Sequence, residues 1–321
     1  MLVSLCYVSK YVFLATTDAV ETDKVQKLLR RTNNEHPLSH YMICESDRLR
    51  IDERSILNLV DSISFTVKQQ VSIDSWKDHT LSFPAMICGR NSVLRVEGPT
   101  VWIHSDDGRS VHFPNVATFI QMLAQAKFII PTAELEDLIR LHVVYVGRTT
   151  ISQRRLRLRG HEKIQASLSE IVAHRPHREL WIKLMAFQPP FIIAAAVPEI
   201  NSKWRDDWMP GKGLLEKLPV QQAVSVIEGA LIRYFEPKMN IQFKNLFPSR
   251  AHKSYKYLYQ KSIRSIRIEL HEEWMIYSTG SDKVAFKKRH SMAYSIAKDK
   301  SEYRLSESDP SALYSPLLGG V

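Results

Sequence analysis

The chain has 321 residues, with 44 Lys+Arg against 34 Asp+Glu and a formal net charge of +10. Hydrophobic residues make up 44% and charged residues 24%, which is typical of a globular protein and excludes a mostly disordered chain. No apolar run approaches the ~20 residues of a membrane span, Lys10 interrupts the apolar N-terminus, and none of the three cysteines lies in a CxxC motif. We therefore expect a reduced, cytoplasmic protein with no membrane partner and no cysteine zinc site.

The first part of the chain, residues 1–126, is expected to form an N-terminal accessory α+β domain. The patterns predict helices over 22–31, 55–61 and 116–126, and strands over 81–88, 93–96 and 100–104. Asp107-Gly108 is a two-residue turn signal and predicts a hairpin over 101–113. Nothing here forms a catalytic constellation, so substrate recognition and protein interaction both remain open as roles for this part.

Residues 127–298 are expected to form a second domain, followed by a flexible tail over 299–321. We expect helices over 133–140, 155–173 and 220–235, and an apolar strand over 142–146 that stops at Gly147. Strands over 180–187 and 191–197 are separated by a Pro189-Pro190 turn. Residues 201–218 are rich in Trp, Gly and charge and are expected to form an exposed insertion.

Positive charge is concentrated in two stretches of this second domain, over 148–163 and 238–267, and tyrosines are interleaved in the second. Such clusters are typical of a phosphate-binding surface, although a surface that is basic for solubility is the ordinary alternative. We expect DNA as the partner and leave RNA open. The residues assigned to nucleic-acid binding are Arg148, Arg154, Arg155, Arg159, Lys244, Lys253, Lys256 and Arg264.

Three fragments stand in a suggestive order along the second domain. They are Val-Tyr-Val-Gly-Arg-Thr over 144–149, Arg157-x3-His161, and Glu-Gly-Ala-Leu-Ile-Arg-Tyr-Phe-Glu-Pro-Lys-Met-Asn from Glu228 to Asn240. Together they resemble the GIY-YIG nuclease superfamily over about a third of the chain. The resemblance implies a small α/β sandwich with a short central antiparallel sheet flanked by helices, alongside the N-terminal α+β domain.

The resemblance also implies a site and a cofactor. Glu228 would be the ligand of a Mg²⁺ (or Mn²⁺) ion, because a carboxylate is a hard oxygen donor. A guanidinium matches phosphate oxygens bidentately, and spacing i to i+4 places Arg157 and His161 on one helical face. The catalytic residues would be Tyr145, Arg157, His161, Glu228 and Asn240, with Gly147 allowing a sharp turn after the strand. Taken singly, each has a plain structural reading, as a core aromatic, a surface side chain or a turn former.

One element of the family pattern is not recognisable. No tyrosine lies between residues 127 and 144, and residues 128–130 are the candidate for the first strand without its tyrosine. Tyr145 then takes the role of base, or another base enters from elsewhere, or the domain binds without cutting.

The function expected is a metal-dependent DNA endonuclease, in a setting such as restriction or DNA defence. The alternatives are a catalytically degenerate nucleic-acid-binding module on a nuclease scaffold, and a structural or interaction protein. A homodimer is one way for a chain with one site to cut both strands.

Overall fold

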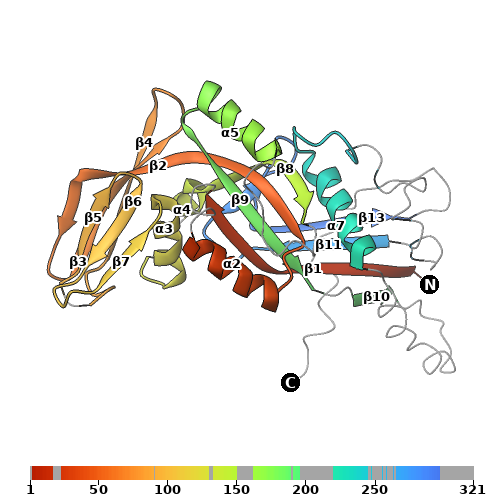
Figure 1. Ribbon diagram of the computed structural model, residues 1–321, viewed down its shortest axis with the longest axis horizontal. Helices are drawn as coiled ribbons and strands as arrows, with labels where there is room; N and C mark the ends of the chain where they lie inside the picture. The colour runs from red at the N-terminus through yellow and green to blue at the C-terminus, as the bar shows by residue number, and fades with distance from the viewer. Residues whose placement is uncertain are drawn as a thin grey trace, which may run out of the picture.

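The computed structural model describes residues 2–16, 23–89, 91–129, 133–149, 162–188, 191–195, 220–244 and 265–296, with isolated positions 247, 255, 258 and 263. The protein is a mixed α+β structure with a ten-stranded mixed sheet and a separate three-stranded antiparallel sheet (Figure 1). The expected α+β class is confirmed at this level. Within the described residues, no helix is long and apolar enough to cross a membrane.

Strands from both parts of the chain form the main sheet. Its path runs β12 (Ser278–Gly280), β8 (Arg140–Arg148), β2 (His40–Asn58), β9 (Arg178–Phe187), β1 (Leu2–Thr16), β11 (Ser265–His271) and β13 (Arg289–Ser295). Neighbours are antiparallel except for the pairs β12/β8 and β1/β11. Because β1 and β2 pair directly with strands of the second half, the boundary expected near residue 126 does not divide this sheet.

Helices cover both faces of the sheet (Figure 1). On one face, α2 (Asp23–Glu35) and α5 (Glu162–His174) bury Leu29, Ile164 and Ile171 against the strands. The larger core on the other side includes side chains of α3 (Val116–Gln125), α4 (Ala133–Leu138) and α7 (Val220–Phe235). The helices expected over 22–31, 116–126, 133–140 and 220–235 are confirmed, with small shifts at their ends. For the helix expected over 155–173, the described part begins at Glu162.

An elongated arm lies between β2 and β8 in the sequence. β2 continues beyond the main path to pair with β3 (Ser62–Gln70), which pairs with β4 (Trp76–Pro84). The three-stranded sheet of β5 (Val93–Glu97), β6 (Thr100–His104) and β7 (Ser110–Phe113) completes the arm, at the opposite end of the molecule from α7 in Figure 1. The expected hairpin is confirmed, with Gly108 in the left-handed region at φ 81°.

Four local expectations need correction. The helix expected over 55–61 is wrong, because β2 extends to Asn58 and pairs with β3 through an irregular register. The strand expected over 81–88 starts earlier and ends at Pro84, and β8 continues through Gly147 to Arg148. Phe128 and Ile129 form a bend, so they are no first strand of a nuclease sheet. The strand expected over 191–197 needs no such correction: its described part is β10 (Phe191–Ala195), which follows β9 along the same partner, β1.

Candidate active site

The neighbour of β8 in the sheet is β2, which comes from far upstream in the chain. The two strands are antiparallel, and Tyr41 lies opposite Gly147 while Ile43 lies opposite Tyr145. The antiparallel neighbour of β8 is therefore formed by residues 40–45, and this strand carries a tyrosine, Tyr41.

The two tyrosine rings are neighbours on the face covered by α2 and α5. Their centroids are 5.8 Å apart, Tyr41 is 4% exposed and Tyr145 is partly buried. Gly147 makes the approach of Tyr41 feasible, because a Cβ there would lie 2.6 Å from both Cζ and the hydroxyl oxygen of Tyr41. The glycine thus serves by leaving space for a ring, whereas the expected sharp turn is absent.

Burial and neighbouring groups keep the Tyr41 phenol protonated. Desolvation raises its pKa most, and hydrogen bonding and electrostatic interaction with Tyr145, together with the charge of Glu228, raise the pKa further. Glu228 is therefore one of the groups that act on Tyr41. In this state Tyr41 is a hydrogen-bond donor and a poor base.

Glu228 lies on α7 and pairs with Arg148, the last residue of β8. Nε of Arg148 is 3.7 Å from Oε2 of Glu228, and Nη1 donates a hydrogen bond of 2.6 Å to Oγ of Ser225, one turn earlier on the helix. The side chain of Glu228 is 15% exposed, against 51% for Arg148. Burial raises the pKa of the Glu228 carboxyl, and the charge of Arg148 partly offsets this rise.

The Glu228 carboxylate accepts no hydrogen bond from any described residue, and its described charge partner is the Arg148 guanidinium. The Glu228 oxygens are not among the buried polar atoms that lack a partner, so solvent or a ligand can reach them. A mostly buried carboxylate held in this way is suited to a ligand that brings positive charge.

The donor set fits a Mg²⁺ or Mn²⁺ ion in an open site. The described residues contain no group of three or more His, Cys, Asp or Glu side chains able to hold a metal. Mg²⁺ is commonly held by one or two carboxylates, with waters and a substrate phosphate completing its shell. Glu228 can supply that single carboxylate, and a closed, all-protein cage is not formed by the described part of the chain.

Asn240 braces β8 from the segment that follows α7. Its Oδ1 accepts a hydrogen bond of 2.8 Å from the backbone N–H of Val146, and its Nδ2 donates one of 2.8 Å to the carbonyl of the same residue. The backbone N–H of the preceding Met239 also donates to the carbonyl of Val144, at 3.1 Å. Asn240 therefore fixes the strand that carries Tyr145, Gly147 and Arg148.

His40 ties β2 to α7 on the other side of the strand from Tyr41. Its Nε2–H donates to the carbonyl of Val224 at 2.9 Å, and its Nδ1 lies 2.8 Å from the hydroxyl of Ser39. Burial lowers the pKa of His40 to about 4, so the ring is neutral. We assign it a structural role.

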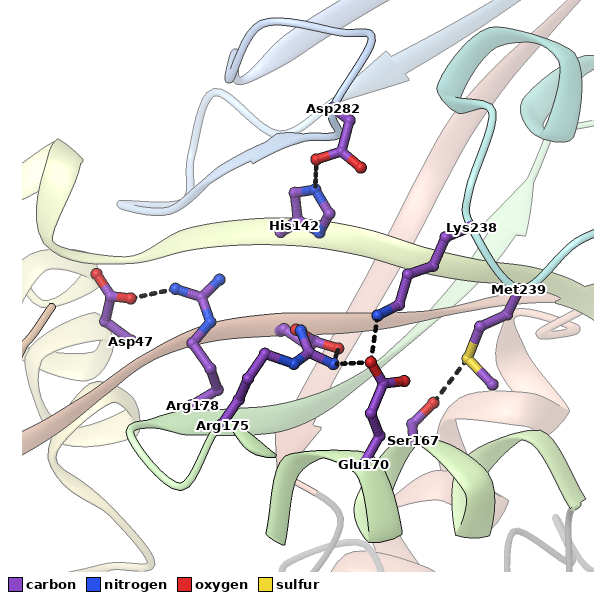
Figure 2. Close-up of polar contacts among 10 residues, drawn as sticks. Asp47, His142, Ser167, Glu170, Arg175, Arg178, Lys238, Met239 and Asp282 are labelled. Carbon is purple, nitrogen blue, oxygen red and sulfur yellow. Dashed lines mark hydrogen bonds and ion pairs between the residues drawn. The ribbon is translucent and has the colours of Figure 1, made fainter. Parts of the chain in front are cut away.

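Polar contacts hold α5 against the segment that follows α7 (Figure 2). Glu170 pairs with Lys238 at 2.7 Å and with Arg175 at 3.1 Å, and the hydroxyl of Ser167 donates to the sulfur of Met239 at 3.0 Å. Arg175 also pairs with the buried Glu45 of β2. The same segment, Lys238 to Asn240, thus holds both α5 and β8.

Several expected site residues lie outside the described residues: Arg154, Arg155, Arg157, Arg159, His161, Lys253, Lys256 and Arg264. Their roles stay predictions. Lys244 is described and partly buried, and its backbone carbonyl accepts a hydrogen bond from Arg233. Among the described residues, Tyr145 packs against Tyr41 beside Gly147, and Arg148 pairs with Glu228 and donates to Ser225. Asn240 is hydrogen-bonded to Val146 on the same strand.

Tyr41 and Ser225 were missed in the sequence. His40-Tyr41-Met42-Ile43 is a short apolar and aromatic run, a signal that could have marked a strand with a tyrosine. Ser225 gave no comparable signal.

Comparison with protein-family models, with curated proteins and with solved structures found no match to this chain.

Proposed function

We propose that the protein is a metal-dependent endonuclease that hydrolyses phosphodiester bonds in DNA, with a catalytic centre related to that of the GIY-YIG superfamily. The single observation that carries this proposal is that β8 carries both Tyr145, which packs against Tyr41 of β2, and Arg148, which pairs with Glu228 of α7. A phenol pair, a guanidinium and an under-bonded carboxylate supply what phosphodiester hydrolysis requires.

Each group has a role that follows from its chemistry. Bound at Glu228, a divalent ion would supply Lewis-acid stabilisation of the extra charge on the phosphate. Arg148 extends into solvent and offers a planar fork to phosphate oxygens. Asn240 holds the strand in register with α5 and α7 through its two hydrogen bonds to Val146.

The two phenols share the handling of the attacking water. Burial favours the protonated form of Tyr41, so Tyr41 donates a hydrogen bond and orients Tyr145. Tyr145 is the more exposed member of the pair and is proposed as the residue that accepts the proton of the water. Arg157 and His161 complete the proposed catalytic set.

The test is cleavage of supercoiled plasmid DNA by the purified full chain with Mg²⁺ or Mn²⁺. We expect Glu228→Gln to abolish nicking with little loss of DNA affinity, because the amide keeps the shape and loses the charge. Tyr145→Phe should also abolish nicking, and Tyr41→Phe should reduce it. Glu273→Gln is the matched control, since Glu273 is exposed and lies outside the site. Unchanged nicking by both Glu228→Gln and Tyr145→Phe would refute the proposal.

The high pKa of the buried Tyr41 phenol favours one alternative, a nucleic-acid-binding module on an inactive nuclease scaffold. It would retain DNA in a salt-dependent way and cut nothing with either metal. Parallel binding assays with DNA and RNA at ~50 mM salt separate this outcome from the absence of any nucleic-acid affinity.

A further inference from the structure

We propose that Arg148 is a displaceable counter-ion that couples cation binding at Glu228 to phosphodiester binding. Without a divalent ion the guanidinium neutralises the carboxylate; with the ion bound, the guanidinium is released to the phosphate. This inference rests on the proposed function and assigns a coupling role to a residue that the sequence analysis assigned to nucleic-acid binding alone.

Arg148 makes a long ion pair with Glu228 and a short hydrogen bond with Ser225. The distance of 3.7 Å between Nε of Arg148 and Oε2 of Glu228 is longer than a hydrogen bond. The same guanidinium is hydrogen-bonded through Nη1 to Ser225 at 2.6 Å, and the Ser225 hydroxyl in turn donates to the carbonyl of Gln221 at 3.0 Å. The contact with Glu228 can therefore break while the tether to Ser225 keeps the guanidinium beside α7.

The exposure of the two side chains also supports an ion pair that a cation and a phosphate can separate. The Arg148 side chain is 51% exposed and the Glu228 side chain 15%, so the cation faces solvent while the carboxylate lies beneath it. A phosphate arriving from solvent meets the guanidinium first. A divalent ion needs the carboxylate oxygens that face Arg148, and two cations repel each other over one carboxylate.

Competition at the carboxylate makes the two binding events interdependent. Metal binding frees the guanidinium for a phosphate, and phosphate binding draws the guanidinium away from the carboxylate. By linkage, the factor by which metal raises DNA affinity equals the factor by which DNA raises metal affinity. Part of that factor should disappear when Arg148 is removed.

The direct test is Mn²⁺ binding to the full chain in the absence of nucleic acid, measured from the electron paramagnetic resonance of free Mn²⁺. Arg148→Met removes the competing charge and keeps much of the side-chain length. Since a half-exposed ion pair is worth up to about 1 kcal/mol, we expect Mn²⁺ to bind about fivefold more tightly. Arg140→Met is the matched control, because Arg140 lies at the other end of the same strand, is half-exposed and pairs with Asp137.

The second measurement is retention of a short phosphorothioate duplex with and without Mn²⁺. The wild type and Arg140→Met should bind the duplex more tightly with Mn²⁺, and Arg148→Met should show a smaller gain. Urea denaturation of each variant shows that it is folded.

Three results would overturn the inference. Unchanged Mn²⁺ affinity in Arg148→Met means that the arginine does not compete for the carboxylate, and weaker affinity means that it positions Glu228 for the ion. Equal Mn²⁺ affinity in the wild type and Glu228→Gln removes the metal site itself. The last result also defeats the proposed metal-dependent nuclease, whereas the first two leave that proposal standing.

Discussion

Gly147→Ala is the sharpest test of the tyrosine pair, because one methyl group is added where two rings converge. The new Cβ would lie 2.6 Å from Cζ and the hydroxyl oxygen of Tyr41 and 2.8 Å from Cε1 of Tyr145. Carbon atoms in contact are normally ~3.5–4.0 Å apart, so each ring has to move by about 1 Å. Tyr41 is 4% exposed and packed between α5 and its neighbours in the sheet, which restricts this movement.

The expected cost is the cost of overpacking a core. Such insertions destabilise by about 1–3 kcal/mol, and the smaller entropy of alanine in the unfolded chain returns less than about 1 kcal/mol. We expect Gly147→Ala to lower the free energy of unfolding by about 1–3 kcal/mol in urea denaturation. Nicking activity should fall more than this loss of stability explains, because the phenols are displaced.

A double-mutant cycle between Gly147 and Tyr41 tests whether the Tyr41 ring causes the loss of stability. With Tyr41→Leu in the background, the closer of the two rings that meet the new Cβ is gone, so Gly147→Ala should cost at least about 1 kcal/mol less than in the wild type. If the two substitutions are additive within about 0.5 kcal/mol, the glycine is not there to admit Tyr41, and our account of the strand pairing at this site is wrong.

The remaining predictions concern stability and are read by urea denaturation. Asn240→Ala should cost about 2–4 kcal/mol, because the buried N–H and C=O of one residue on β8 both lose their partner. The fully buried Lys183–Glu272 pair should show a loss of about 3–5 kcal/mol for Lys183→Met, and a much smaller loss when Glu272→Met is added, since the unpaired charge is then gone too. His40 has a folded-state pKa of about 4 against 6.5 unfolded, so the unfolded chain binds its proton first. Stability should fall by about 3 kcal/mol as pH drops from 6.5 to 4, and His40→Gln should flatten this slope. Burial raises the pKa of Glu228 above its unfolded value, so the charged carboxylate destabilises the folded state at neutral pH. Glu228→Gln should therefore stabilise the protein at neutral pH, and the gain should vanish below the ordinary glutamate pKa of 4.5.

Elements with strong local signals could be predicted from the sequence. The periodicity of α7 and α3 and the Asp107-Gly108 turn depend on residues close together in the chain, and the structure has them where expected. The strands of the main sheet were harder to predict. β2 contains Glu45 and Asp47, which look like solvent-facing residues, yet Glu45 is buried because Arg175 neutralises it. A strand whose charges are paired from elsewhere carries no clear alternation.

The candidate site, like the fold, contains residues that could be found from the sequence and residues that could not. Tyr145, Glu228 and Asn240 were marked by the resemblance to a nuclease superfamily, whose motifs all lie within the second half of the chain. Tyr41 could not be found by searching just before β8, because the whole arm from β3 to β7 lies between β2 and β8 in the chain. Strand pairing between distant segments depends on the assembled sheet, which local patterns do not report.

The surroundings of the Glu228 carboxylate favour a functional role for this residue over a purely structural one. Glu45 is also buried and acidic, but Arg175 binds it through both carboxylate oxygens, so it contributes to the fold. Glu228 has no hydrogen bond from the described residues, and burial raises its pKa, so its charged form weakens the fold at neutral pH. Residues that oppose stability in an otherwise consistent structure tend to mark functional sites. If Glu228→Gln leaves stability unchanged across the pH range, the carboxylate is an ordinary surface group, and the strongest physical reason for placing a cation beside the tyrosine pair disappears.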